Sequence, residues 1–274
     1  MFKGRTVKRA FERVGAGVHT GIVGRLEVRP GPPGSGMRFR SRSALGFADL
    51  PVHIDSVRTE AGSTILAGGG RVVRTPEHLL AALVAFQITD VLLVLEGPEV
   101  PILDGSALPW CSALNDVGVV ETGEVRALDA PRLRIEANGG VAEAEPGPIL
   151  RLEVDVSYEW GPRGSAAVEI PGLFVEEVAF ARTFALERDV ERLRAAGRGA
   201  GANLENTVVW GEDGPLNSVR SPQEPILHKL VDLAGDLALV GRPVTGTIRV
   251  RRGSHALHHA LVRAIVAEAG RAAS

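Results

Sequence analysis

The chain has 274 residues, of which 45% are hydrophobic, and a formal net charge of −2, so it can build a large core in one or two domains. No basic stripe runs through the sequence, which argues against a nucleic-acid partner. The single cysteine, Cys111, excludes an internal disulfide and fits a reducing cytoplasm. We therefore expect a cytoplasmic protein in which this thiol is a small buried group.

No segment has the character of a membrane anchor. The N-terminal stretch MFKGRTVKRAFERVG carries charges without the apolar run of a secretory signal. The most apolar region, residues 79–95, is interrupted by Gln87, Thr89 and Asp90, and it is shorter than the roughly 20 clean residues that a membrane span needs. We expect a soluble monomer, for which weak peripheral contact with a membrane surface stays open.

The first half of the chain predicts strands followed by a buried helix. Residues 5–30 favour strands around the tight loop VGAGVHTGIVG, and residues 37–74 contain short strand-like pieces between glycines. The next helix has a recognisable start signal, because Thr75 is suited to the N-cap and Pro76 to the first helical position. Its residues are apolar on all sides, which indicates burial. The strand DVLLVLEG and an amphipathic helix near residues 107–118 follow.

The second half repeats this order. It opens with strand patterns in RLRIEA, ILRLEVDVSYEW and SAAVEIPG, and a helix is expected to begin near Val175. A charged helix in ERDVERLRAAG precedes a glycine-rich segment. The apolar helix in ILHKLVDLAGDLALVG comes next, and Ser221 and Glu224 have the spacing of a capping box before it. The strand TGTIRVRRG and a helix from His255 onward close the chain.

A domain boundary is expected within residues 121–132, which are polar and have no clear period. We assign residues 1–125 to an N-terminal domain and residues 126–274 to a C-terminal domain. Each half has strands, a helix that begins with Pro and Glu and carries a histidine in its first turns, and then an apolar strand, so a duplicated unit is plausible. Runs of strands followed by helices predict an α+β fold.

Two histidines and an aspartate have the spacing of a metal site. His228 and Asp232 are four residues apart in a helix, so they project from one face, and Asp236 follows four residues later. With His78 from the other half, His228 and Asp232 form a set of two nitrogens and one oxygen that fits a zinc site with a fourth position for water. The alternative is an ordinary surface ion pair. Because no H-E-x-x-H pattern is present, the spacing leaves both interpretations open.

Further ionisable groups accompany these candidates. Glu77 is expected at the second helical position, where the helix dipole favours a carboxylate that could take a proton from water beside a metal ion. It could equally serve only to stabilise the start of the helix. His255, His258 and His259 invite a metal interpretation too, but we expect His258 and His259 on exposed or interfacial faces.

Seven stretches, taken in chain order, resemble one family. They are RVGAGVHTG, TPEHLLAAL, GPEVPILDGSALPW, ARTFALERDVERL, GANLENTVV, ILHKLVDLAGDLALVG and SHALHHALVRAI. Together they resemble the zinc-dependent UDP-3-O-acyl-N-acetylglucosamine deacetylases of lipid A biosynthesis, over nearly the whole chain. The resemblance implies hydrolysis of the N-acetyl group of this substrate, with release of acetate and a free 2-amine. It also implies two α+β domains of similar topology with helices packed between their sheets.

The resemblance implies a role for each matching residue of the reaction site. The zinc ligands would be His78, His228 and Asp232. Glu77 would be the general base. His255 would act as general acid or as a cation beside the oxyanion, and Asp236 would orient it. Thr183 would hydrogen-bond the tetrahedral oxyanion.

The resemblance extends to the substrate contacts. Lys229, assisted by Arg252, would meet the sugar or diphosphate, Phe184 would line the sugar site, and Tyr158 would replace a uracil-stacking aromatic. The family's β-α-β insert would be residues 183–209, with an apolar passage for the 3-O-acyl chain. The passage would be lined by Leu186, Val190, Leu193 and Leu204. Since each buried CH₂ contributes about 0.8 kcal/mol, such a passage can select chain length.

The chain departs from the family pattern around His255. Gly253-Ser254 stands where Ser-Gly is usual, and His258-His259 stands where a pair of asparagines is usual. The exact substrate and its acyl preference therefore stay open. Independently of these departures, the sequence also leaves open whether iron replaces zinc in the cell. The alternative function is a catalytically silent or divergent paralogue that binds a different UDP-amino sugar.

Overall fold

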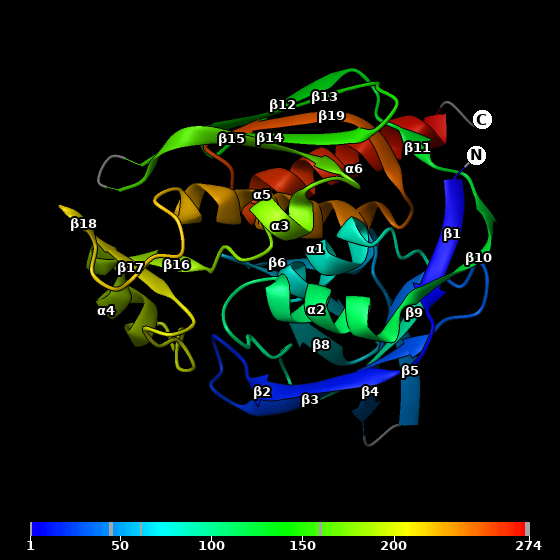
Figure 1. Cartoon of the computed structure of the whole chain (residues 1–274), viewed down its shortest axis with the longest axis horizontal. Helices are drawn as coiled ribbons and strands as arrows, with labels where there is room; N and C mark the ends of the chain where they lie inside the picture. Colours follow the sequence, from blue (N-terminus) through cyan, green and yellow to red (C-terminus); the bar gives the residue numbers. More distant parts are fainter. Residues whose placement is uncertain (1, 44–45, 61, 159–160, 272–274) are drawn as a thin grey trace.

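The computed structural model of the chain describes residues 2–43, 46–60, 62–158 and 161–271. Two open sheets enclose a layer of helices (Figure 1). The first sheet contains, in spatial order, β2 (Phe11–Ala16), β3 (Val23–Pro30), β9 (Val91–Glu96), β4 (Met37–Ser43) and β5 (Gly46–Pro51). The second contains β12 (Leu133–Ala137), β13 (Gly140–Glu145), β19 (Val244–Arg251), β14 (Leu150–Ser157) and β15 (Arg163–Ile170), with β11 (Leu128–Asp129) beside β19.

The two sheets have the same topology. Along the five-strand order of each sheet, neighbouring strands run antiparallel except for one central pair, which is β9 with β4 in the first sheet and β19 with β14 in the second. The additional strand β11 also runs parallel to β19. Every second residue of β14 and β19 is buried. Because successive side chains of a strand point to opposite faces, these buried residues form the inner face of the second sheet, which packs against the helices. The predicted α+β fold, with helices between two sheets, is therefore confirmed.

The helical layer consists mainly of α1 (Glu77–Ala85), α2 (Leu108–Val117), α5 (Glu224–Leu237) and α6 (His255–Arg271). Helix α1 packs against α5 at the centre of the molecule, and α5 packs in turn on β14 and α6. Nearly every residue of α1 is buried, as its apolar composition predicts. Within the described residues, no helix has both the length and the apolar character needed to cross a membrane.

Two helix starts differ from the prediction. Helix α1 begins at Glu77, because Thr75 adopts a φ of 53° and donates its hydroxyl to Glu99 Oε1 over 2.7 Å instead of capping the helix. Helix α5 begins at Glu224 without a capping box. Its Glu224 carboxylate accepts hydrogen bonds from Arg182, while the Ser221 hydroxyl accepts one from the backbone N–H of Gln223. The expected helix near Val175 is the single turn α3 (Phe174–Glu177).

The predicted β-α-β insert is present and projects from one side of the sandwich (Figure 1). It contains β16 (Phe184–Leu186), α4 (Glu187–Ala195) and β17 (Val208–Gly211), with the short β18 (Gly214–Pro215) beside β17. Strands β16 and β17 are parallel, as a crossover through a helix requires.

The remaining strands of the N-terminal half form two small additional sheets. Strand β1 (Phe2–Val7) pairs with β10 (Val119–Val125), and a three-stranded meander contains β6 (Val57–Glu60), β7 (Ser63–Gly68) and β8 (Arg71–Arg74). The chain passes from β10 in this half to β11 in the second sheet at the predicted boundary between residues 125 and 126. That the halves are separate domains stays a prediction.

Candidate active site

Three buried side chains converge where α1 meets α5. His78 lies in the first turn of α1, and His228 and Asp232 lie one turn apart in α5. Each offers one ligand atom, and these atoms lie within 4.8 Å of one another. The two imidazole rings meet edge to face with centroids 4.8 Å apart, and His228 Nε2 is 3.3 Å from Asp232 Oδ1. Because His228 and Asp232 are only 2% and 4% exposed, the alternative of a surface ion pair is wrong.

The protonation states of this cluster suit a divalent metal ion. Burial and the ring of His228 lower the pKa of His78 to about 3, so its imidazole is neutral. Although burial favours the acid form, the Lys229 ammonium, 2.6 Å away, and His228 hold the pKa of Asp232 well below its ordinary value. His78 Nδ1 is buried and has no hydrogen-bond partner among the described residues. A neutral imidazole, as in His78, and an ionised carboxylate, as in Asp232, are forms that bind metal, so these residues fit a zinc ion.

A second buried cluster surrounds Asp236, one turn further along α5. Its Oδ2 accepts hydrogen bonds from His255 Nδ1 at 2.6 Å and from His258 Nδ1 at 2.8 Å. Its Oδ1 accepts one from the Thr64 hydroxyl and lies 3.5 Å from His259 Nε2. The prediction that His258 and His259 lie on exposed or interfacial faces is wrong. They share one face of α6 with His255 and are buried there. The available signal was their spacing of three and four residues from His255, which places the three rings on one face of a helix but does not by itself predict burial.

Glu77 connects the two clusters. Its Oε1 lies 3.7 Å from His255 Nε2, and its Oε2 is buried without a hydrogen-bond partner in the described part of the chain. Burial raises the pKa of Glu77 to about 8. Burial also disfavours a charged His255, but Asp236 outweighs this and raises the pKa of His255 to about 10. The carboxyl group of Glu77, whose pKa lies near neutral pH, therefore faces the protonated imidazole of His255. This arrangement is suited to general acid–base chemistry.

A cavity of about 430 Å³ opens onto these groups. The predicted site residues in its wall are Glu77, His78, Tyr158, Thr183, Phe184, Leu186, His228, Lys229, Asp232 and His255. The ring of Phe184 packs against Tyr158 with centroids 5.7 Å apart, and the Lys229 ammonium lies 5.5 Å from its centroid. Arg252 is exposed and does not line this cavity, although Gly253 beside it does.

A smaller cavity of about 150 Å³ lies within the insert. Val190, Leu193 and Leu204 line it, as expected for an apolar passage. Leu186 instead faces the larger cavity, and Leu193 lines both. The two cavities thus adjoin at α4.

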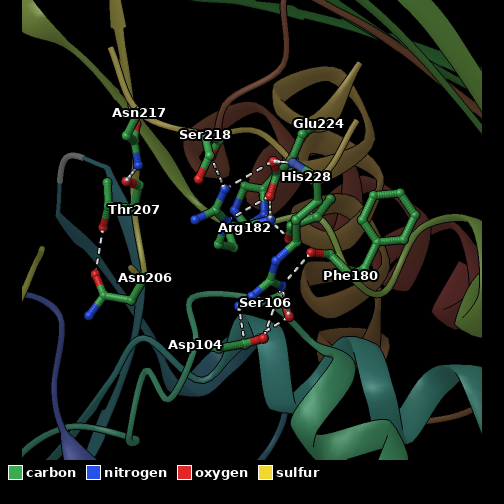
Figure 2. A network of polar contacts seen from close by, with 12 residues as sticks. Asp104, Ser106, Phe180, Arg182, Asn206, Thr207, Asn217, Ser218, Glu224 and His228 are labelled. Carbon is green, nitrogen blue, oxygen red and sulfur yellow. Dashed lines mark hydrogen bonds and ion pairs between the residues drawn. The ribbon is translucent and has the colours of Figure 1, made fainter. Parts of the chain in front are cut away.

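A buried ion pair beside the site escaped the sequence analysis. Arg182 and Glu224 are 4% and 0% exposed, and Nε of the arginine lies 2.8 Å from Oε1 of the glutamate (Figure 2). The available signal was the position of both charges, since Arg182 precedes Thr183 in an otherwise apolar stretch and Glu224 opens an apolar helix. Such residues are almost never fully buried unless they are paired.

Comparisons with known proteins agree with this site. A family model described as "LpxC: UDP-3-O-acyl N-acetylglycosamine deacetylase" matches residues 4–267. The chain belongs to the LpxC family. Relatives named UDP-3-O-acyl-N-acetylglucosamine deacetylase include proteins of Thermosynechococcus vestitus, 38% identical over 95% of this chain and 93% of that protein, and of Solibacter usitatus, 34% identical over 96% and 91%. A relative from Neisseria meningitidis is 33% identical over 96% of this chain and 90% of that protein.

The LpxC match confirms the resemblance that the seven sequence stretches indicated. It covers both halves of the chain, and the two clusters and both cavities lie inside the matched residues.

Proposed function

We propose that the chain is a zinc-dependent hydrolase that removes the N-acetyl group of UDP-3-O-acyl-N-acetylglucosamine in lipid A biosynthesis. The observation that carries the proposal is the convergence of His78, His228 and Asp232 beside Glu77 and His255 on one cavity. The names of the relatives supply the substrate class. A cytoplasmic location and a monomeric state stay predictions.

The zinc ion would be held by His78, His228 and Asp232. Catalytic zinc sites with three protein ligands keep one position for water or substrate. When bound, the ion would supply a Lewis acid that lowers the pKa of water to about 7 and polarises the acetamide carbonyl. Lys229 would remain paired with Asp232 and contribute positive charge where a sugar or diphosphate approaches.

Glu77 would act as the general base. It would take a proton from the water that attacks the acetamide carbon, which forms a tetrahedral intermediate. A base works best when its pKa lies near the operating pH, and burial brings the pKa of Glu77 into that range.

His255 and Thr183 would complete the reaction. His255, oriented through Nδ1 by Asp236, would stabilise the developing negative charge and then protonate the departing nitrogen as the C–N bond breaks. Thr183 would hydrogen-bond the oxyanion through its hydroxyl. The backbone of Thr183 is fixed, since its N–H donates to Gly105 O and its carbonyl accepts from Val208 N–H. Acetate and the free 2-amine would leave.

The two cavities would divide the substrate between them. Phe184 would contact the glucosamine, and Tyr158 would contact the uracil ring. Lys229 would contact the diphosphate, and Arg252 would assist it from the surface outside the larger cavity. The insert cavity would take the 3-O-acyl chain against Val190, Leu193 and Leu204. We therefore expect substrates without this acyl chain to be turned over poorly.

The test is acetate release from UDP-3-O-acyl-N-acetylglucosamine by the purified chain, with and without a chelator. We expect one tightly bound zinc, activity that chelation removes and zinc restores, and a Glu77→Gln variant that keeps zinc but loses roughly 10²–10⁴ in turnover. Glu96→Gln, at an exposed carboxylate of β9, is the matched control and should behave as the unaltered protein. A zinc-loaded chain that binds the nucleotide sugar without releasing acetate would favour the catalytically silent alternative.

A further inference from the structure

Residues 178–183 connect α3 to β16 without forming a helix or strand, yet the backbone groups of residues 181–183 make several hydrogen bonds. Ala181 N–H donates to Val178 O, Thr183 N–H donates to Gly105 O over 2.8 Å, and Thr183 O accepts from Val208 N–H. Ala181 O lies 3.0 Å from Nδ1 of His228. This segment therefore touches a candidate metal ligand and contains the candidate oxyanion donor.

The ion pair between Arg182 and Glu224 clamps this segment. Glu224 Oε1 accepts hydrogen bonds from both the backbone N–H and Nε of Arg182, at 3.0 and 2.8 Å. Nη1 of Arg182 donates to Glu205 O at 3.0 Å. Nη2 donates to Ser218 O at 2.6 Å (Figure 2). One buried guanidinium thus binds the start of α5 and two loops around the insert at the same time.

Arg220 extends the clamp to the N-terminal half. Its backbone N–H donates to Glu224 Oε2, and its Nη1 donates to Phe180 O over 2.8 Å and pairs with Asp104 Oδ2 over 2.9 Å. The segment before Thr183 is consequently tied to the loop before α2 as well as to α5. Its position is set from both halves.

The contact between Ala181 and His228 decides which ring nitrogen can bind a metal. A backbone carbonyl only accepts hydrogen bonds, so Nδ1 of His228 must carry the proton. Nε2, which lies 3.3 Å from Asp232 Oδ1 inside the cluster, is then the nitrogen that can bind a metal ion. A hydrogen bond from the second nitrogen is the usual way in which proteins fix the tautomer and orientation of a metal-binding histidine.

We propose that Arg182 and Glu224 are positioning residues for metal binding. They hold the carbonyl of Ala181 at the place where it fixes His228 as an Nε2 ligand, and they hold Thr183 over the cavity. A buried ion pair seldom stabilises a fold more than apolar side chains of the same size would. We therefore infer that this pair serves to hold Ala181 and Thr183 in position rather than to stabilise the fold. The inference rests on the proposed function only in requiring that the chain binds zinc; it does not require deacetylation.

The first experiment uses the unaltered, zinc-loaded protein. Two-bond ¹⁵N–¹H correlation spectra of histidine-labelled protein report the protonation of each ring nitrogen, and His228→Gln assigns the signal. We expect a protonated Nδ1 and a metal-bound Nε2 for His228. Metal coordination through Nδ1, or an Nδ1 without a proton, would overturn the proposal.

The second experiment measures zinc affinity by competition with a chelator, in the absence of substrate. Arg182→Lys keeps the charge but loses the forked hydrogen bonds, and Glu224→Gln keeps the shape but loses the charge. Loss of such outer partners typically weakens metal binding about 10–100-fold, and we expect weakening of this size in both variants. The visible spectrum of bound cobalt should also change, because the ligand orientation changes.

A destabilised control separates positioning from general loss of stability. Leu26→Ala leaves a cavity in the first sheet at a fully buried position outside the site. We expect its zinc affinity and cobalt spectrum to match the unaltered protein. Equal affinities in this control and in folded Arg182→Lys would contradict the proposal, and if Glu224→Gln does not fold, Arg182→Lys and the histidine spectra still decide. Since neither readout involves acetate release, a chain that binds zinc but does not deacetylate leaves this test intact.

Discussion

Gly235 of α5 lies directly against the backbone carbonyl of Glu77 in α1. A Cβ atom built on Gly235 would be 2.1 Å from Glu77 O, a separation that real Cβ atoms do not show. Only glycine therefore allows the two helices to cross at this distance. The same crossing places His78 beside His228 and Asp232, so the candidate metal site depends on the absence of one methyl group.

The first prediction concerns this crossing. Gly235→Ala should push α1 away from α5, because neither backbone can yield locally, and should lower the free energy of unfolding by about 1–3 kcal/mol. Metal content after dialysis should fall as well, since the ligand atoms separate. Urea unfolding and metal analysis measure the two effects. Gly270→Ala in α6 is the matched control, because nothing lies within 4 Å of its added Cβ, and it should be neutral or stabilising. Identical behaviour of the two variants would contradict the argument.

The second prediction concerns Asp236, which raises the pKa of His255 to about 10. Asp236→Asn removes the negative charge, so the pKa of His255 should fall. If the reaction needs protonated His255, activity is lost as pH rises through this pKa, and the alkaline limb of the turnover profile should move to lower pH. The measurement is turnover between pH 6 and pH 10. Asp129→Asn, at an exposed carboxylate in β11, should leave the limb in place. An unshifted limb in Asp236→Asn would rule out His255 as the group that titrates there.

The third prediction concerns the single cysteine. Cys111 is fully buried in α2, and burial raises the pKa of its thiol to about 12. Because the thiolate is the reactive form, a disulfide reagent at pH 8 should label the folded protein far more slowly than free cysteine. Addition of denaturant should then expose one reactive thiol per chain. Rapid labelling of the folded protein, with unchanged unfolding behaviour, would show that α2 opens without global unfolding.

The sequence predicts those parts of the fold that depend on local pattern. Alternation in ILRLEVDVSYEW gave a strand with one buried face, and the apolar run after Pro76 gave a buried helix. Spacing placed His228 and Asp232 on one face of a helix, which is also a local property. The convergence of His78 on this pair is not local. It depends on the crossing of α1 and α5, which are far apart in the chain, so the residue types only suggested a shared metal ion and the family resemblance supplied the further support.

Other features escaped local patterns for related reasons. Thr75 has the composition of an N-cap, but its hydroxyl is used by Glu99, which comes from the loop after β9. His258 and His259 are polar residues for which exposure is the ordinary expectation, and their burial depends on buried partners, Asp236 for His258 and Thr64 with Asp236 for His259. Long-range partners thus decided both cases. The roles of the individual site residues stay predictions until they are tested.

The last prediction concerns the pH dependence that the buried Glu224 contributes to stability. Burial alone would raise the pKa of Glu224, but hydrogen bonds from Arg182 and from the backbone of Arg220 outweigh it and hold the pKa below its ordinary value. A depressed carboxyl pKa contributes stability above the unfolded value of about 4.3, and this contribution is lost as pH falls through the folded value. Glu224→Gln should therefore cost about 3–5 kcal/mol of unfolding free energy at pH 7, because Arg182 is left buried without its counter-charge, and less near pH 3. Urea unfolding of the metal-free proteins at both pH values measures this difference without interference from zinc loss in acid. Glu212→Gln, at an exposed carboxylate, should change stability by less than about 0.5 kcal/mol throughout. A cost for Glu224→Gln that is the same at both pH values would show that the charge of Glu224 contributes nothing beyond its shape.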